Sequence, residues 1–288
     1  MEAIFFAFLA FIGWGVGDIF VAVSARKLNA YSSTVWSLSL TTFLLGILSF
    51  FFLDDLKNMT PSIFLLNSFL GFLLISGIIA FREAFIRGAS PIVSVISASF
   101  AVVTTILSVI FFQEKLTQPQ IIAVLIIFAG LLLTMLNFND LKKRELRFNK
   151  SILLAIFSMF AFGAYFAFIK IPVSEIGWFW PNYISLVAPF PLLLLFIKIR
   201  KIKIIKPNQN GALVPLILSF ALARTGELSY NLGISKGFAS VVAPISGANP
   251  VLFVILSAIF LKDPVTKQQI LGIITTLIGI VLLSTFSI

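Results

Sequence analysis

The chain has 288 residues, of which 59% are hydrophobic and 11% are charged. Soluble domains carry about 25% charged residues, so this composition excludes a soluble globular protein and predicts an integral membrane protein. The formal net charge is +10, and the chain contains no cysteine or histidine, which excludes disulfides, thiol chemistry and the usual zinc sites.

Apolar stretches of roughly 20 residues, the length that crosses the hydrocarbon core of a bilayer, recur along the whole chain. They predict transmembrane helices near 3–24, 31–53, 62–81, 90–112, 118–137, 151–170, 177–198, 212–230, 238–261 and 267–286. The first stretch carries Trp14 and Asp18 and lacks the cleavage site of a signal peptide, so we expect a retained helix. Because the connections are short, consecutive helices are expected to be antiparallel neighbours, with no separate soluble domain.

The two halves of the chain repeat each other with a constant offset of 149 residues. Arg87–Val93 corresponds to Lys236–Val242, and Glu114 corresponds to Asp263, without a gap. Identical pairs at this offset are Ile96/Ile245, Ser97/Ser246, Ile106/Ile255, Leu107/Leu256, Ser108/Ser257, Phe111/Phe260, Gln120/Gln269 and Gly130/Gly279. The chain is therefore predicted to contain a duplicated unit.

Each copy of this unit holds five predicted spans, and an odd number of spans places the second copy upside down in the membrane. Inverted duplications of this kind build the central site of many secondary transporters. We therefore predict an all-α integral membrane fold of ten transmembrane helices, arranged as two inverted five-helix repeats over 1–137 and 151–288. A basic linker over 138–150 joins the two repeats.

Lysine and arginine are distributed unevenly between the loops. The loops after odd-numbered spans carry 16 of these residues and the loops after even-numbered spans carry four. Cytoplasmic loops are enriched in lysine and arginine, so the odd-numbered loops are predicted to be cytoplasmic and both termini external. The basic charge is not interpreted as a nucleic-acid surface, which would need basic and aromatic residues interleaved on a face exposed to water.

Charged residues inside the predicted spans are the sharpest chemical signal. A charge at the bilayer centre costs at least about 2.5–3.5 kcal/mol, so it normally faces a cavity or a partner. Asp18 follows a glycine-rich stretch in the first span, where glycines allow a neighbouring helix or a ligand to come close. Arg224 and Glu227 lie three residues apart in the eighth span and can pair, either at a ligand site or as a lock between helices.

Arg82 and Glu83, at the end of the third span, are interpreted as interfacial charges whose side chains reach the headgroups. Asn249 and the proline that follows it interrupt the ninth span, and a proline frees a backbone carbonyl that can bind a ligand. The residues predicted to bind substrate or to take part in coupling are Trp14, Asp18, Arg224, Glu227, Tyr230 and Asn249. Asp18 is the first choice for a coupling acid because no cation lies within four residues of it, and a structural hydrogen-bonding role is the alternative.

The repeated segment resembles the motif of the EamA family in the drug/metabolite transporter superfamily. In the second half the motif consists of Gly233–Pro244, Asp263, Thr266, Gln269 and Gly272, and in the first half of Ala84–Ser90, Glu114, Thr117 and Gln120. The departures are Ala123, where the first copy would carry glycine, and Asp263, where glutamate is usual. Glu114 and Asp263 are interpreted as helix-end structure, because charges lie most cheaply at the interface.

The resemblance implies a basket of helices in which the fifth and tenth spans are peripheral and the others surround a central cavity. It implies a secondary transporter in the cell membrane that moves small organic solutes such as amino acids, nucleosides or drugs by alternating access, with protons as one possible coupling ion. We expect no cofactor, no enzymatic activity and no nucleic-acid partner. The alternatives are an intramembrane enzyme, in which only Asp18 and Glu227 would serve as acid or base, and a structural or regulatory membrane protein that does not transport.

Overall fold

The computed structural model of the chain describes residues 1–88, 90–135, 150–256, 258–259 and 265–287. In the first half its helices are α1 (Glu2–Leu28), α2 (Ala30–Leu48), η1 (Ser49–Asn58), α3 (Pro61–Arg87), α4 (Ser90–Ala98), α5 (Phe100–Phe112) and α6 (Gln118–Met135). In the second half they are α8 (Lys150–Phe168), α9 (Lys170–Ile176), α10 (Phe179–Val187), α11 (Phe190–Ile199), η2 (Gln209–Gly211), α12 (Leu213–Lys236), α13 (Ala239–Ser246), α14 (Asn249–Leu256) and α15 (Lys267–Thr285). The predicted linker, except for Lys150, and the motif residue Asp263 lie outside the described residues.

Seven helical segments within the described ranges are long and apolar enough to cross a membrane. They are Glu2–Leu28, Ala30–Asn58, Pro61–Arg87, Lys150–Ile176, Phe179–Ile199, Ala239–Leu256 and Lys267–Thr285. Two further apolar helices, Ile96–Phe112 and Gln118–Thr134, are shorter. The predicted all-helical membrane fold is confirmed in class, whereas the number of ten spans stays a prediction.

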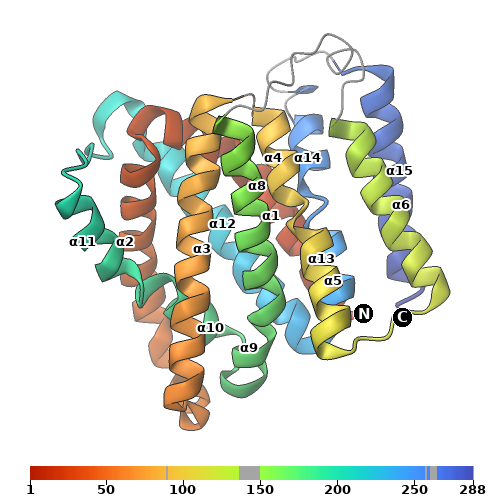
Figure 1. Ribbon diagram of the computed structural model, residues 1–288, viewed down its shortest axis with the longest axis horizontal. Coiled ribbons are helices and arrows are strands. Elements are labelled where there is room, and N and C mark those ends of the chain that lie inside the picture. The colour runs from red at the N-terminus through yellow and green to blue at the C-terminus, as the bar shows by residue number, and fades with distance from the viewer. Residues whose placement is uncertain (89, 136–149, 257, 260–264, 288) are drawn as a thin grey trace.

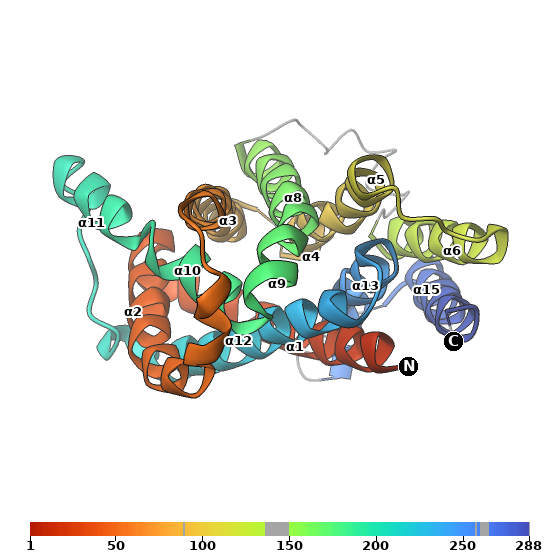
Figure 2. The same ribbon diagram turned by 90° about the horizontal axis from the view of Figure 1, so that it is seen from below.

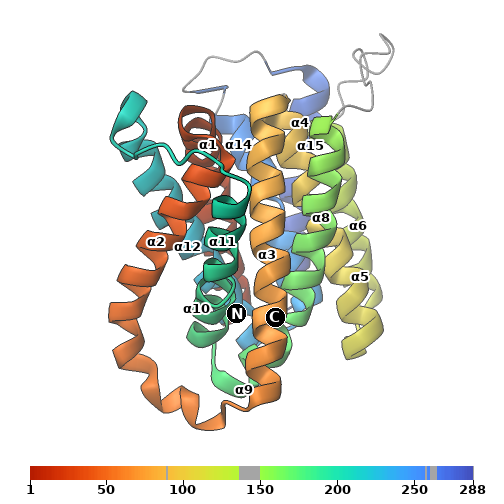
Figure 3. The same ribbon diagram turned by 60° about the vertical axis from the view of Figure 1, so that its left-hand side comes forward.

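The helices pair across the two halves of the chain. α1 packs along α12, and the corresponding helices with the halves exchanged, α8 and α3, pack along each other. The last helices of the two halves, α6 and α15, form a third pair, which Figure 2 shows at one end of the molecule, away from α2 and α11. Figure 1 shows both termini at one edge of the bundle, while α6 ends and α8 begins at the opposite edge. Figure 3 shows α3 crossing the full height between these two edges.

The threonine and the glutamine of each repeated motif, three residues apart in both copies, mark the start of the peripheral helices. The Gln120 side chain accepts a hydrogen bond from the backbone N–H of Thr117 (2.8 Å), and Gln269 does the same for Thr266 (2.9 Å). The Thr266 side chain also accepts from the Gln269 backbone, which completes a capping box at the start of α15. This part of the motif therefore satisfies backbone donors at helix ends.

Glycines bring the paired helices into backbone contact. A Cβ atom on Gly13 of α1 would lie 2.8 Å from the Leu222 carbonyl oxygen in α12, and one on Gly226 would lie 2.5 Å from the Trp14 ring. In the peripheral pair, Gly130 lies directly against Thr276, and Gly272 against Thr134. Because no side chain fits at these positions, the glycines fix how closely the helices pack.

Two of the predicted spans are broken near their middle. α4 ends at Ala98 and α5 begins at Phe100, while α13 ends at Ser246 and α14 begins at Asn249. The two breaks lie together, because a Cβ atom on Gly247 would contact Ala101 and the Ala98 carbonyl oxygen. These broken helices bring the side chain of Asn249 to the centre of the molecule.

Candidate functional site

A cavity of about 90 Å³ lies at the centre of the bundle. Its polar lining comes from five helices and consists of Asp18, Arg82, Ser94, Ser97, Arg224, Glu227 and Asn249. Its remaining walls are aromatic or aliphatic and include Trp14, Phe81, Phe100, Phe162 and Phe166. Five of the six residues predicted from the sequence therefore line one cavity, and Tyr230 does not.

Asp18 is the point at which three helices meet in the cavity. Its Oδ2 atom accepts a hydrogen bond from Nδ2 of Asn249 in α14 (2.9 Å) and one from the hydroxyl of Ser94 in α4 (3.4 Å). Both donors are neutral, and the Asp18 side chain is buried. The glycine-rich stretch of α1 allows this approach, because a Cβ atom on Gly15 would lie 3.0 Å from the Asn249 carbonyl oxygen.

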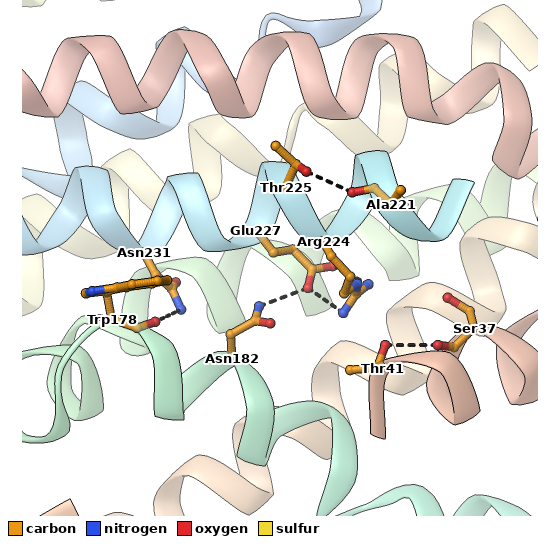
Figure 4. Close-up of polar contacts among 9 residues, drawn as sticks. All are labelled: Ser37, Thr41, Trp178, Asn182, Ala221, Arg224, Thr225, Glu227 and Asn231. Carbon is orange, nitrogen blue, oxygen red and sulfur yellow. Dashed lines mark hydrogen bonds and ion pairs between the residues drawn. The ribbon is translucent and has the colours of Figure 1, made fainter. Parts of the chain in front are cut away.

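Arg224 and Glu227 form a buried ion pair on α12, as Figure 4 shows. Nη1 of Arg224 lies 2.6 Å from Oε2 of Glu227, and Nη2 donates to Oε1 at 2.7 Å. Asn182 of α10 donates a further hydrogen bond to Glu227 (3.0 Å). Glu227 is thus held by a cation and an amide, and the pair neutralises its own charge.

Arg82 lies in the same cavity, so the prediction that it is an interfacial charge was wrong. It is only 4% exposed, and its Nε and Nη1 atoms have no hydrogen-bond partner in the part of the chain that the structure describes. Leu74, Ile78 and Arg82 recur every four residues and therefore share the inward face of α3. Glu83 points away from the cavity and pairs with Arg87 (2.9 Å), one turn later at the end of α3.

An aromatic cluster closes the cavity on the side of the termini. Trp14 packs against Phe100, Phe166 and Tyr230, with ring centroids 5.7, 5.1 and 5.8 Å apart. The Tyr230 hydroxyl donates a hydrogen bond to the Phe166 carbonyl oxygen (3.0 Å), which ties α12 to α8 beside the cluster. The end of α12 lies beside the start of the chain, since Lys236 pairs with Glu2 at 3.7 Å. Tyr230 therefore packs behind Trp14 and Phe166, which line the cavity, on the side of α12 that leads to this face.

The motif acid of the first half, Glu114, connects the halves on the same face. It forms an ion pair with Lys170 of α9, and it accepts hydrogen bonds from the backbone N–H groups of Ala239 (3.1 Å) and Ser240 (2.8 Å) at the start of α13. Burial raises the pKa of the Glu114 carboxyl, but the hydrogen bonds from Lys170 and Ser240 outweigh burial and hold that pKa below its ordinary value. This geometry agrees with the expected helix-end role.

Sequence reasoning missed Arg82, Ser94 and Ser97 as cavity residues. The four-residue spacing from Leu74 to Arg82 was the available signal for Arg82, because it places the arginine on a buried face. Ser97 shares a hydrogen bond of 2.7 Å with Ser158 of α8, so it links helices as well as lining the cavity. No pattern around Ser94 distinguishes it from the small residues that serve helix packing.

Comparison with known proteins identifies the family and the fold of the chain. The sequence matches the EamA-like transporter family over residues 1–136 and 149–285. An uncharacterized protein of Methanocaldococcus jannaschii, MJ1333.1, is 35% identical over 133 residues, which is 46% of this chain and 92% of that protein. A crystal structure described only as that of a protein covers 99% of this chain and 97% of its own chain with a TM-score of 0.77 and 13% identity, so it shares the fold. The chain is therefore an integral multi-pass membrane protein that belongs to the EamA-like transporter family, a group of membrane transporters of the drug/metabolite type.

Proposed function

We propose that this protein is a secondary active transporter that moves small organic solutes across the cell membrane through its central cavity. The observation that carries this proposal is the placement of four ionisable side chains, Asp18, Arg82, Arg224 and Glu227, around one cavity formed by both halves of the chain. Charges at this depth are costly in a bilayer and typically mark a pathway for a substrate or an ion.

The proposed architecture is ten spans in two inverted repeats, over 1–137 and 151–288, with the basic segment 138–150 between them. The exchange of partners supports it, because α1 packs on α12 as α8 packs on α3. The relative in Methanocaldococcus jannaschii supports it as well, since nearly its whole length matches only about half of this chain. Duplication of a five-span unit accounts for both observations.

Alternating access would proceed by rocking of the two repeats around the cavity. On the face of the termini, opening requires the aromatic cluster at Trp14 and Tyr230 to separate and the contact from Glu114 to α13 to break. The peripheral pair α6 and α15 contributes no residue to the cavity lining, so it can stay packed while the other helices move.

We assign the coupling role to Asp18, with the proton as the coupling ion. Glu227 is less suited to release and rebind a proton, because Arg224 and Asn182 both stabilise its charged form. Asp18 accepts hydrogen bonds from two neutral donors, Ser94 and Asn249, and the cation that faces it from α3 is Arg82. A carboxyl group in this setting can alternate between a proton and a solute.

The test is uptake of a panel of radiolabelled metabolites into proteoliposomes under an imposed pH gradient. We expect wild-type protein to accumulate at least one solute chemically unchanged, and Asp18→Asn to lose the dependence on the pH gradient. Glu227→Gln serves as the comparison for a second cavity acid, and Glu2→Gln as a control for an exposed one. Full pH-driven uptake by Asp18→Asn would show that Asp18 is only a structural group, and chemical conversion of the solute would favour an enzyme.

A further inference from the structure

We propose that Arg82 binds a carboxylate of the solute, so that the ligands of this cavity are small molecules with a single carboxylate and an apolar body. This inference rests on the proposed function and specifies its substrate class. It starts from an imbalance between donors and acceptors in the cavity, in which Nε and Nη1 of Arg82 are buried without partners among the described residues.

A buried guanidinium without acceptors is unfavourable, because it has lost the hydrogen bonds that water would make with it. Its planar fork of donors matches the two oxygens of a carboxylate, which can accept two parallel hydrogen bonds. Arg82 lines the cavity, and its Nε and Nη1 atoms are covered in this conformation, so a rotation of the guanidinium would present these donors to an incoming group. A bound carboxylate would therefore satisfy the donors that the protein leaves open.

The other charges limit the ligand to one negative charge at this position. Arg224 is already neutralised by Glu227, with which it forms two close contacts. Asp18 lies within electrostatic reach of Arg82, so the lining has one positive charge to spare when Asp18 holds a proton and none when Asp18 is ionised. A simple acid therefore fits the protonated form of Asp18, and a zwitterion fits the ionised form. Since the described lining offers Arg82 as its one cation without an ion-pair partner, a divalent anion would bring an uncompensated charge into the bilayer.

The remaining walls suit an apolar body. Phe81, Phe162 and Phe166 line the cavity near Arg82 and Trp14, and aromatic side chains commonly line small-molecule pockets in which a few polar groups fix the orientation. The volume of about 90 Å³ restricts the occupant to a compact molecule. Benzoate and 3-phenylpropionate are suitable probes because each combines one carboxylate with one ring.

A carboxylate of this kind occurs in simple organic acids and in zwitterions such as L-phenylalanine. The cavity also contains Oδ1 of Asn249, a buried acceptor without a partner among the described residues, beside the Asp18 carboxylate. An ammonium group on the ligand would find acceptors there, whereas a simple acid would leave them unchanged. Both ligands share the contact with Arg82, and they differ in whether binding needs Asp18.

The experiment compares each acid with its amide, which has the same shape without the charge. Dissociation constants for purified protein in detergent are measured for benzoate and benzamide, 3-phenylpropionate and its amide, L-phenylalanine and its amide, and sulfate as a divalent anion. Wild-type protein is compared with Arg82→Gln, with Arg82→Lys, which keeps the charge without the fork, and with Asp18→Asn. Arg87→Gln is the matched control, because Arg87 lies on the same helix outside the cavity.

We expect at least one acid to bind, its amide and sulfate not to bind, and Arg82→Gln to weaken the acid about tenfold or more, in line with hydrogen bonds to charged groups. Arg82→Lys should retain part of the wild-type affinity for the acid, and Arg87→Gln should retain all of it. Loss of binding in Asp18→Asn would identify the ligand as a zwitterion, and retained binding as a simple acid. Equal binding of acid and amide, unchanged affinity in Arg82→Gln with the protein folded, or no binding of any acid in the panel would overturn the assignment.

Uptake into proteoliposomes separates this inference from the proposed function. Arg82-dependent binding of an acid that the vesicles never accumulate would leave the carboxylate site standing and contradict transport. Accumulation of an uncharged solute that is equally fast in wild-type protein and in Arg82→Gln would support transport and overturn the carboxylate site.

Discussion

The carboxylate of Glu114 joins elements from both halves of the molecule. Lys170 and two backbone N–H groups of α13 converge on it, while the side chain itself is almost fully buried. An acid at the start of a helix also interacts favourably with the helix dipole. Its contribution comes from charge-assisted hydrogen bonds, which are stronger than hydrogen bonds between neutral groups.

Replacement of Glu114 by glutamine is expected to lower the stability of the protein by about 1.5–3 kcal/mol, the range for hydrogen bonds to charged groups. The amide cannot neutralise Lys170 and cannot accept from all three donors. The midpoint of thermal unfolding in detergent measures the loss. Glu2→Gln is the control, because the pair of Glu2 and Lys236 is long at 3.7 Å and exposed to solvent, and it should change the midpoint little. We call the contacts of Glu114 with Lys170 and with the backbone of α13 the Glu114 clamp. Equal midpoints for wild type and Glu114→Gln would show that this clamp does not stabilise the fold.

The same contact should make stability depend on acid pH. Because the pKa of Glu114 in the folded protein lies below the ordinary value of 4.5, the carboxylate contributes stability that is fully present above pH 4.5. That contribution is lost as the pH falls through the lower pKa of the folded state. The difference in unfolding midpoint between wild type and Glu114→Gln should therefore be constant from pH 7 to about pH 5 and shrink below pH 4.5. A difference that grows on acidification would be inconsistent with the lowered pKa.

At the residue scale, the sequence identified most of the cavity residues but was less informative about which way each side chain faces. Charge inside an apolar stretch was enough to select Asp18, Arg224 and Glu227, because the cost of burying a charge needs no structure to estimate. Tyr230 is polar but uncharged, and it packs against Trp14 without lining the cavity. Arg82 was misassigned because its place near the end of α3 suggested the membrane interface. In the structure its helical spacing from Leu74 and Ile78 turns it toward the cavity instead.

At the scale of elements, the pair α1 and α12 forms one wall of the cavity through glycines on both helices. The position of the polar groups of α12 in the cavity depends on this pairing, since Gly226 lies against Trp14 and Glu227 is the next residue. A small change in the separation of the helices would therefore move both an aromatic wall and a charged pair.

Gly226→Ala should destabilise the protein by about 1–3 kcal/mol, the usual cost of overpacking, because the new Cβ atom would lie 2.5 Å from the Trp14 ring. The displaced indole should also lower uptake in proteoliposomes. Gly46→Ala in α2 is the control, since its Cβ atom would meet only the Tyr183 hydroxyl at 3.1 Å and ring carbon at 3.9 Å. The unfolding midpoint should stay near the wild-type value in the control, and a Gly226→Ala variant as stable and active as wild type would refute the close packing.

The helix breaks illustrate what pattern alone can and cannot locate. The break before Asn249 was expected, because two prolines lie in the ninth span and proline cannot continue the hydrogen-bond ladder. The break at Ser99 in the fourth span has no nearby proline, because the proline of that span, Pro91, lies at the start of the span. It arises where α5 packs against Gly247 of the other half, which is a contact that local sequence does not encode.

At the scale of the whole molecule, the internal repeat and the hydrophobic runs were sufficient to predict a helical membrane protein, and the resemblance of the repeated motif predicted its family. They could not define which faces of the helices meet, because an apolar residue packs as well against lipid as against another helix. The exchange of α1 and α8 between the halves is a property of tertiary packing, and only the structure reports it.

The orientation in the membrane can be measured with single cysteines, since the natural chain contains none. Lys57 precedes α3 on the face of the termini, and Lys203 follows α11 on the opposite face, where its carbonyl oxygen accepts from Asn29. A membrane-impermeant maleimide should label Lys57→Cys in intact cells and Lys203→Cys only after permeabilisation, as the distribution of lysine and arginine predicts. The reverse pattern would invert the orientation without affecting the fold.

If the protein works by the alternating access proposed above, the Glu114 clamp also affects the rate of the transport cycle. In that cycle it would break and re-form once per turnover, so its strength would influence how often the face of the termini is open. A clamp of about 2 kcal/mol would lower the ratio of open to closed molecules roughly thirtyfold, because each 1.4 kcal/mol changes a population ratio tenfold. Weakening it would lengthen the open intervals and alter the turnover rate, while the choice of solute would remain with the cavity.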